Sequence, residues 1–295
     1  MQVASSTWRP AIPAFLIHSR KYGFIIVRLA QIATGFCMPE SKKPSAKQAI
    51  FVNAETIALN KGLCAFLDSS PSPFHATRML GHMLAQAGFS ELDESEDWQL
   101  QPGQKYFVTR NQSSLVAWQQ GDTPLVESGW RMLGAHTDSP CLKLKPRPEL
   151  IKHDTMQLGV EVYGGALLNP WFDRDLSIAG RVHYLDSKGE LRASLLDFAR
   201  PLAVIPSLAI HLDREVNKNR TINAQDHLPA LIGAAQPAAE NDFLQLLAEE
   251  LPAQWQRDND ASARKHGLAT ILDHELLLYD TQRAVMQGLR GEYIA

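Results

Sequence analysis

Leu133-Gly134-Ala135-His136-Thr137-Asp138-Ser139-Pro140 is the stretch that decides how the fold of this chain is interpreted. The apolar run 130–135 predicts a β-strand, and the Ser-Pro pair ends it. Side chains two residues apart on a strand point the same way, so His136 and Asp138 are expected on one face. A zinc-bound histidine needs this arrangement, because a nearby carboxylate orients the ring nitrogen that does not bind the metal. A solvated strand end has the same pattern, so the spacing alone leaves both interpretations open.

Two helices are predicted before this strand. Apolar residues recur at helical spacing over 54–67, and Asp68-Ser69-Ser70-Pro71 ends the run. Ser72 and Pro73 supply an N-cap and a first-turn proline for a second helix, which stops at Gly88. His75 in its first turn is expected at the surface. The face expected to fill the core consists of Met79, Leu80, Met83, Leu84 and Ala87.

Short β-strands dominate the rest of the chain. Residues 105–110 and 114–118 predict a hairpin, and further strands are expected at 157–163, 180–185, 190–195, 203–205 and 268–279. One amphipathic helix is predicted over 237–251, with Phe243, Leu244, Leu247 and Leu251 on its buried side. His274 is expected on the surface of the last strand.

Three segments resemble signatures of the aspartyl aminopeptidases, a family of dinuclear zinc exopeptidases. The first is Ala135-His136-Thr137-Asp138-Ser139-Pro140 and the residues up to Pro146. The second comprises Tyr163-Gly164-Gly165 and Trp171-Phe172-Asp173-Arg174-Asp175-Leu176, and the third is Ile205-Pro206-Ser207-Leu208-Ala209-Ile210-His211-Leu212-Asp213-Arg214. They stand in the family's order, and the resemblance runs from about Thr56 to Ala295.

The resemblance implies an α/β fold in four parts. Residues 51–145 are expected to form the N-terminal part of a zinc-exopeptidase catalytic domain, and 146–265 an inserted β-rich dimerisation domain. Residues 266–295 would then return to the catalytic domain, which is expected to be truncated. Residues 1–50 lie outside the resemblance as an atypical leader, for which a mistaken upstream start, a targeting segment and a disordered extension are open alternatives.

The resemblance also assigns roles to residues of this chain. His136 is expected to bind zinc and Asp138 to act in catalysis beside it. His211 matches a residue that is either a metal ligand or a stabiliser of the tetrahedral oxyanion, delivered across a dimer. The spacing around His211 alone also fits a half-buried structural histidine. Two zinc ions per site are expected in the full-length family.

The bridging aspartate and the catalytic glutamate of the family are not found in this sequence, so the chain is expected to end before them. Glu249 and Glu250 are no substitute, because adjacent helical side chains diverge by about 100°. The run Asp173-Arg174-Asp175 favours an ion-pair network over metal ligation. Lys143, Lys145 and Arg174 are candidate cations for binding an acidic substrate group.

The predicted function is a zinc metalloaminopeptidase that removes acidic N-terminal residues, Asp or Glu, from peptides, although the activity of this chain alone is doubtful. A homo-oligomer is expected, either a dimer or a higher assembly of dimers. The alternative is a non-catalytic fragment that serves oligomerisation or interaction. Whichever holds, the net charge of -3 gives no electrostatic case for nucleic acid or a membrane surface.

The cysteines and the apolar segments of the chain indicate in which cellular compartment it is expected. Cys37, Cys64 and Cys141 are far apart in the sequence, which argues against a disulfide framework and a thiolate zinc site. Cys141 is expected to be a small buried hydrophobe. The apolar run 22–29 is too short to span a bilayer. A reducing, cytoplasmic location is therefore expected.

Overall fold

The computed structural model describes residues 17–19, 23–25, 54–235 and 242–295. The expectations for residues 1–50, and for Cys37 among them, lie outside these ranges except at two short strands. These strands, β1 (Ile17–Ser19) and β2 (Gly23–Ile25), pair antiparallel.

Both predicted N-terminal helices form, as α1 (Ala54–Asp68) and α2 (Pro73–Gln86). Ser72 caps α2 by accepting a hydrogen bond from the backbone N–H of His75. The expectation that Met79, Leu80 and Met83 fill a core is wrong, because Met83 is 44% exposed and the other two are half-buried. The first turn of α2 is buried instead, His75 included, so its expected surface position is also wrong.

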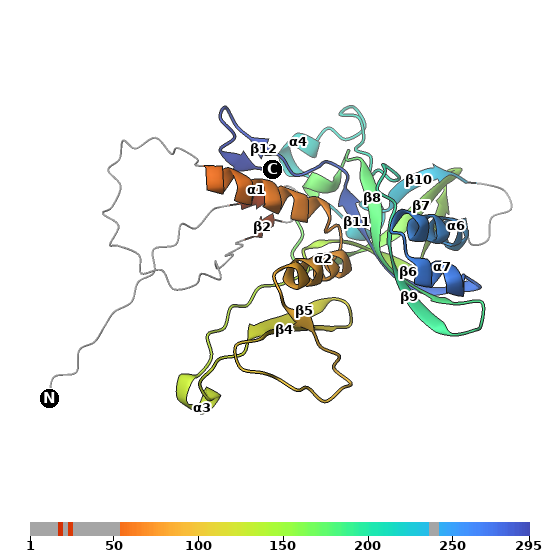
Figure 1. The fold of residues 1–295 in the computed structure, drawn as a ribbon. Helices are drawn as coiled ribbons and strands as arrows, with labels where there is room; N and C mark the ends of the chain where they lie inside the picture. Colours follow the sequence, from red (N-terminus) through yellow and green to blue (C-terminus); the bar gives the residue numbers. More distant parts are fainter. Residues whose placement is uncertain (1–16, 20–22, 26–53, 236–241) are drawn as a thin grey trace, which may run out of the picture.

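A three-stranded sheet follows, made of β3 (Ser90–Glu91), β4 (Lys105–Arg110) and β5 (Ser114–Gln119). The predicted hairpin is confirmed, and Asn111 and Gln112 turn it with φ values of 52° and 56°. Helix α2 lies between this sheet and a larger one (Figure 1) and contacts strands of both. The α2 helix therefore joins the two sheets.

The strand expected at 130–135 is not present. After the short helix α3 (Leu125–Ser128), residues 129–140 form no helix or strand in the described structure. Met132 is 87% exposed and Leu133 70% exposed. A strand needs a neighbour to pair its backbone groups, and no described segment lies in register with this one.

Six strands form the large sheet in the order β10-β7-β6-β11-β8-β9, and every neighbouring pair is antiparallel. They are β6 (Cys141–Lys152), β7 (Thr155–Tyr163), β8 (Leu176–Leu185), β9 (Leu191–Asp197), β10 (Ala230–Ala234) and β11 (Thr270–Asp280). The expected β-rich character is confirmed. Strand β6 begins before residue 146 and β11 lies beyond residue 265, so the sheet extends across both predicted domain boundaries. The division of the chain into these domains stays a prediction.

Helices α6 (Asp242–Arg257) and α7 (Ala261–His266) lie on one face of this sheet (Figure 1). Of the predicted helix 237–251, residues 237–241 lie outside the described ranges. The helical repeat places Phe243, Leu247, Leu251 and Trp255 in the core, each at most 3% exposed. The ring of Trp255 lies 5.4 Å from that of Tyr184 on β8. The main core therefore lies between α6 and the sheet.

His274 on β11 is part of this core, so its expected surface position is wrong. It is 5% exposed and its ring meets the edge of Phe243 at 5.6 Å. Strand alternation places His274 on the face of the sheet that α6 covers. The sequence of the strand alone does not reveal which face a helix covers.

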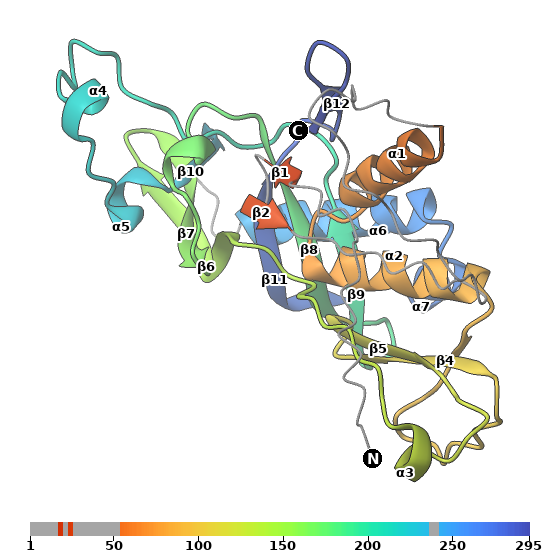
Figure 2. The same cartoon turned by 90° about the vertical axis from the view of Figure 1, so that its left-hand side faces the viewer.

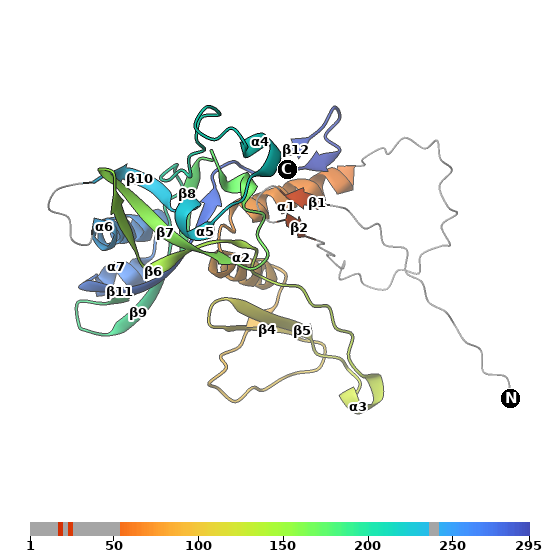
Figure 3. The ribbon, with the colours of Figure 1, turned by 180° about the vertical axis from the view of Figure 1, so that it is seen from behind.

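The remaining short elements lie at two ends of the molecule. Helix α4 (Val216–Asn219) precedes α5 (Ala224–His227), and α5 contacts β7 (Figures 2 and 3). Strands β12 (Met286–Gln287) and β13 (Tyr293–Ile294) pair near α1, where the backbone N–H of Ala284 donates to Asp68 at 2.8 Å. The 3-10 turn Asn169–Trp171 precedes β8. Among the helices in the described ranges, none combines the length and the apolar character that crossing a membrane requires.

Candidate functional site

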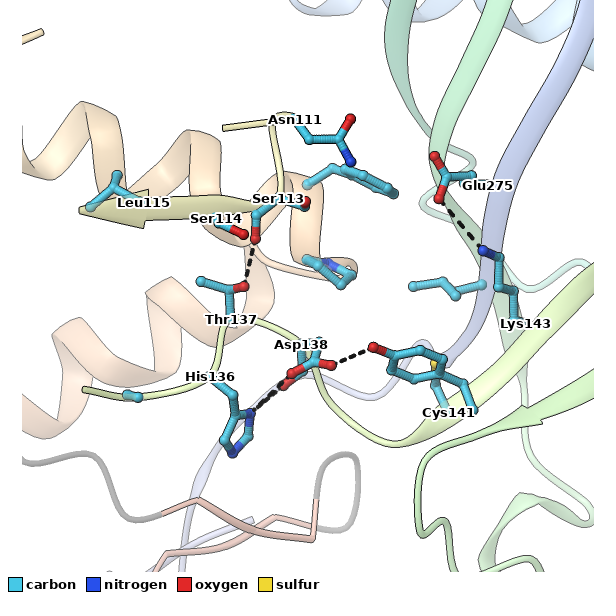
Figure 4. A pocket seen from close by; sticks show the side chains of 15 residues that line it. Asn111, Ser113, Ser114, Leu115, His136, Thr137, Asp138, Cys141, Lys143 and Glu275 are labelled. Carbon is cyan, nitrogen blue, oxygen red and sulfur yellow. Dashed lines mark hydrogen bonds and ion pairs between the residues drawn. The ribbon is translucent and has the colours of Figure 1, made fainter. Parts of the chain in front are cut away.

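Residues 135–138 and Cys141 form one wall of a cavity of about 450 Å³ (Figure 4). The start of α2, the turn between β4 and β5, and the strands β6, β7 and β11 supply the other walls. Its polar lining includes Asn111, Ser113, His136, Asp138, Lys143, Tyr163 and Glu275. Segments that are far apart in the sequence thus meet around the loop that carries His136 and Asp138.

The structure brings His136 and Asp138 together, although not through strand alternation. Nδ1 of His136 lies 2.5 Å from the carbonyl oxygen of Asp138 and 3.5 Å from its Oδ1. A carbonyl oxygen only accepts, so Nδ1 carries the hydrogen of the neutral ring and Nε2 keeps its lone pair. This tautomer leaves Nε2 able to bind a metal ion.

Two further hydrogen bonds hold this loop in place. Thr137 Oγ1 donates to the carbonyl oxygen of Ser113 at 2.6 Å, and Tyr163 Oη donates to Asp138 Oδ2 at 2.5 Å (Figure 4). The hydrogen bond to Asp138 raises the pKa of Tyr163. Both carboxylate oxygens of Asp138 therefore have neighbours, one towards β7 and one towards His136.

A buried arginine supports the opposite wall of the cavity. Arg181 on β8 is 6% exposed, and its guanidinium lies over the ring of Phe74 at 4.4 Å. Its Nη1 donates to the carbonyl oxygen of Asn111 at 2.8 Å, and its Nη2 pairs with Glu275 at 2.5 Å. Lys143 lies 3.5 Å from the other oxygen of Glu275. Burial raises the pKa of Glu275, but the Arg181 hydrogen bond and charge outweigh it, so that pKa lies below its usual range.

Sequence reasoning missed Arg181, Glu275 and Ser113. Arg181 is the one Lys, Arg, Asp or Glu residue in the mostly apolar strand β8, and a charge at such a position is a signal for a buried ion pair. Ser113 contributes a backbone carbonyl, which leaves no trace in the sequence.

Cys141 borders the cavity as a buried side chain. It is 7% exposed, and burial, with the nearby Asp138 charge, raises the pKa of its thiol to about 12. The thiol is therefore protonated near neutral pH when no metal ion is bound. The prediction that Cys141 is a small buried hydrophobe is confirmed.

His211 lies apart from this cavity in the structure. It occupies a turn after the β-bridges at 203–205, is exposed, and is not among the described residues that line the cavity. The alternative interpretation of His211 as a half-buried structural histidine is wrong, because its side chain is exposed in a loop.

The other acidic clusters behave as structural groups. Arg174 Nη1 pairs with Asp280 at 3.2 Å, and Asp173 accepts the backbone N–H of Ser207 at 2.8 Å, which confirms an ion-pair role for this run. Glu250 pairs with Arg257 at 2.7 Å, while Glu249 is exposed.

The described residues do not fit a complete zinc site by themselves. No group of three or more histidine, cysteine, aspartate or glutamate side chains gathers among them. A zinc ion in a protein usually takes four ligands, more than this cavity gathers.

The fold is that of a metallopeptidase family. The family described as aminopeptidase I zinc metalloprotease (M18) matches residues 66–295, and the chain belongs to that family. The "Probable M18 family aminopeptidase 2" of Stutzerimonas stutzeri (strain A1501) is 51% identical over 239 residues, which cover 80% of this chain and 53% of that protein. The resemblance to the aspartyl aminopeptidases is confirmed at the level of this family.

Solved structures agree with the fold. The one described as the cryo-EM structure of the Ape4 and Nbr1 complex is similar with a TM-score of 0.67 and 32% identity, covering 81% of this chain and 48% of that one. The S. cerevisiae mApe1 dodecamer matches with a TM-score of 0.56 and 23% identity, over 79% of this chain and 50% of that one, and supports the fold alone. The chain spans about half the length of the relatives that it matches.

Proposed function

We propose that the cavity at His136 is part of the site of a zinc aminopeptidase that removes N-terminal residues from peptides. The observation that carries the proposal is the fixed His136 ring, whose Nε2 keeps a free lone pair in a polar cavity of an M18 family chain. His136 is the proposed metal ligand and Asp138 the group that orients it. The other ligands of the two zinc ions expected per site are proposed to come from residues outside this partial site.

The proposed substrate is a peptide with an acidic N-terminal residue, and Lys143 is the proposed cation that meets it. Lys143 lines the cavity, where its partner Glu275 already pairs with Arg181. The other candidates are engaged elsewhere: Lys145 pairs with Glu161 at 3.4 Å, and Arg174 with Asp280. The cluster of Arg181, Lys143 and Glu275 therefore carries one positive charge beyond its internal pairs, which favours a carboxylate.

His211 is proposed to act in the site of a second copy. Its exposure in a loop supports this assignment, because an exposed histidine away from its own cavity is free to reach a partner. We keep both chemical roles, zinc ligand and oxyanion stabiliser, for this residue.

The non-catalytic alternative is favoured by one observation, the lack of a three-ligand cluster among the described residues. A chain with one imidazole at its site can still take part in an assembly whose catalytic groups come from elsewhere. The two functions differ in one respect: the aminopeptidase requires zinc to bind at His136, and the non-catalytic fragment does not.

The test is zinc binding and hydrolysis by the purified chain. We expect weak zinc binding by calorimetry that His136→Ala abolishes, and no turnover of aspartyl or glutamyl amides with zinc, cobalt or manganese. The matched control is His82→Ala, which removes an exposed histidine from α2. Metal-dependent turnover that disappears in His136→Ala contradicts the proposal that this chain holds only part of the site. Zinc binding that survives the same substitution contradicts the assignment of His136 as a metal ligand.

A further inference from the structure

Asn111, in the turn between β4 and β5, lines the cavity at His136 and is held there by Arg181. Its φ of 52° is in the left-handed region, which asparagine adopts more readily than most residues. Arg181 Nη1 lies 2.8 Å from the backbone carbonyl oxygen of Asn111 and 3.1 Å from its Oδ1. One guanidinium nitrogen therefore fixes both the backbone and the side chain of this turn residue.

These contacts decide which end of the Asn111 amide faces Arg181. A guanidinium has donors only, so the atom that it meets is the oxygen, and Nδ2 faces away from it. Figure 4 shows this nitrogen on the side of Asn111 that faces the interior of the cavity. Among the described residues, none accepts a hydrogen bond from Nδ2. The amide group is therefore a donor that is directed into the cavity and available to a ligand.

Lys143 supplies a second donor to the same cavity. Its Nζ lies 3.5 Å from Glu275 Oε2, a long contact that uses one of three ammonium hydrogens. Arg181 lies closer to Glu275, with Nη2 at 2.5 Å from Oε1. Because the guanidinium is the closer partner of this carboxylate, the ammonium group of Lys143 keeps donors for a ligand.

The other carboxylate of the cavity lies away from these two donors. Figure 4 shows Asp138 across the cavity from Asn111 and Lys143. Its two oxygens face Tyr163 Oη at 2.5 Å and His136 Nδ1 at 3.5 Å. The side of the cavity that Asn111 and Lys143 form therefore combines hydrogen-bond donors with a positive charge, which is the chemistry that binds a carboxylate.

We propose that Asn111 is a specificity-determining residue of this cavity, whose Nδ2 binds one oxygen of a peptide carboxylate while Lys143 Nζ binds the other. A carboxylate accepts from both donors. A carboxamide has one acceptor oxygen, and its own N–H groups would face a donor. Arg181 is the positioning residue, because it fixes the direction of the Asn111 amide. The assignment of the carboxylate to an acidic N-terminal side chain rests on the proposed function.

The experiment is an NMR titration of the 295-residue chain with two peptides that differ only in a first residue of Glu or Gln. Both peptides carry a C-terminal amide, so the Glu side chain holds the one carboxylate. EDTA is present throughout, so that binding is measured without metal. We expect the Glu peptide to bind about tenfold more tightly than the Gln peptide and to shift the side-chain amide resonance of Asn111.

Asn111→Asp separates the contact with Arg181 from the contact with the ligand. Both hydrogen bonds from Arg181 still find an oxygen, so the urea midpoint is expected to stay the same, but an acceptor replaces the Nδ2 donor. We expect the Glu peptide to bind about tenfold more weakly. The Gln peptide should stay within about twofold of its parent value, because its amide is able to donate to the new carboxylate.

The matched control is Gln112→Glu, which adds the same charge at the next residue. Gln112 is exposed and is not among the described residues that line the cavity. We expect it to weaken binding of the Glu peptide by less than about twofold, because an exposed charge outside the cavity is screened by solvent.

Equal weakening by Asn111→Asp and Gln112→Glu overturns the proposal, because the added charge alone then explains the loss. An Asn111 amide resonance that the Glu peptide leaves in place also overturns it, and this measurement needs no variant. So does a parent chain that binds neither peptide.

A third peptide, with Gln first and a free C-terminal carboxylate, distinguishes the two sources of the ligand. If it binds as tightly as the Glu peptide and shifts the Asn111 resonance, the carboxylate site is supported and the acidic N-terminal residue of the proposed function is contradicted. Failure of zinc to bind at His136 contradicts the proposed metal ligand and leaves these metal-free titrations unaffected.

Discussion

At the scale of single residues, His75 shows how burial controls a charge. Its Nδ1 lies 2.7 Å from Ser72 Oγ, and its Nε2 has no hydrogen-bond partner among the described residues. Burial, with the nearby charge of Arg78, lowers the pKa of His75 to about 3. The imidazole is therefore neutral in the folded chain and becomes protonated first in the unfolded chain as the pH falls.

We expect acid to destabilise the fold through His75. Its folded pKa lies below the unfolded value, so its contribution is complete above about pH 6.5 and is lost progressively as the pH falls towards 3. Between pH 7 and pH 5 the loss is about 2 kcal/mol. Burial also lowers the pKa of His274, which adds a loss of the same sign.

Urea unfolding at pH 7 and pH 5 measures this loss. His75→Gln keeps a polar group but does not protonate, so its free energy of unfolding is expected to change less between the two pH values. His82→Gln, on the exposed side of the same helix, serves as the control. An unchanged pH dependence in His75→Gln contradicts the assignment.

The sequence predicted part of the candidate site at this scale. The closeness of His136 and Asp138 follows from a separation of two residues, which keeps them near each other whether or not a strand forms. Arg181 and Glu275 are 94 residues apart, and their pairing depends on the order of β8 and β11 in the sheet. The sequence pattern does not contain that order.

At the scale of elements, Gly180 on β8 faces the backbone of β11 with no room for a side chain. A Cβ atom built on Gly180 would lie 2.0 Å from the carbonyl oxygen of Glu275. That carbonyl belongs to the strand backbone and has no freedom to move aside. The glycine thus permits a contact between the strands that carry Arg181 and Glu275.

Gly180→Ala is expected to destabilise the chain by about 3 kcal/mol, because the two strands must separate to admit the methyl group. Loosening of the Arg181–Glu275 pair should follow. The measurement is urea unfolding at pH 7, compared with Gly233→Ala, where the added Cβ meets no described atom within 4 Å. Equal free energies of unfolding for the two variants would contradict this prediction, because the strands would then separate without a cost in stability.

Local patterns predicted the three longest helices and six of the strands, and the absence of the strand expected at 130–135 has a physical reason. The hairpin of β4 and β5 and the helices α1 and α2 depend on turns, caps and spacing within one segment. The segment 130–135 has the pattern of a strand, yet a strand also requires a neighbour that the described chain does not supply.

At the scale of the whole molecule, the exposed loop 207–214 is a candidate contact between copies. Leu208, Ile210 and Leu212 are between 52% and 68% exposed and flank His211. Apolar side chains gathered on one loop are typical of a protein interface.

We expect the full chain to be a dimer or a larger assembly at tens of micromolar, because burying three leucine or isoleucine side chains in each copy contributes several kcal/mol. Leu212→Glu should shift the mass from light scattering to that of a monomer, since a charge would be buried at the interface. Leu289→Glu, at a fully exposed position near β12, is the control and should leave the mass unchanged. A monomeric parent chain contradicts assembly, and an oligomer that Leu212→Glu leaves intact places the interface elsewhere. In that second case His211 loses its proposed route to the site of a second copy, because the loop that carries it would not meet another chain.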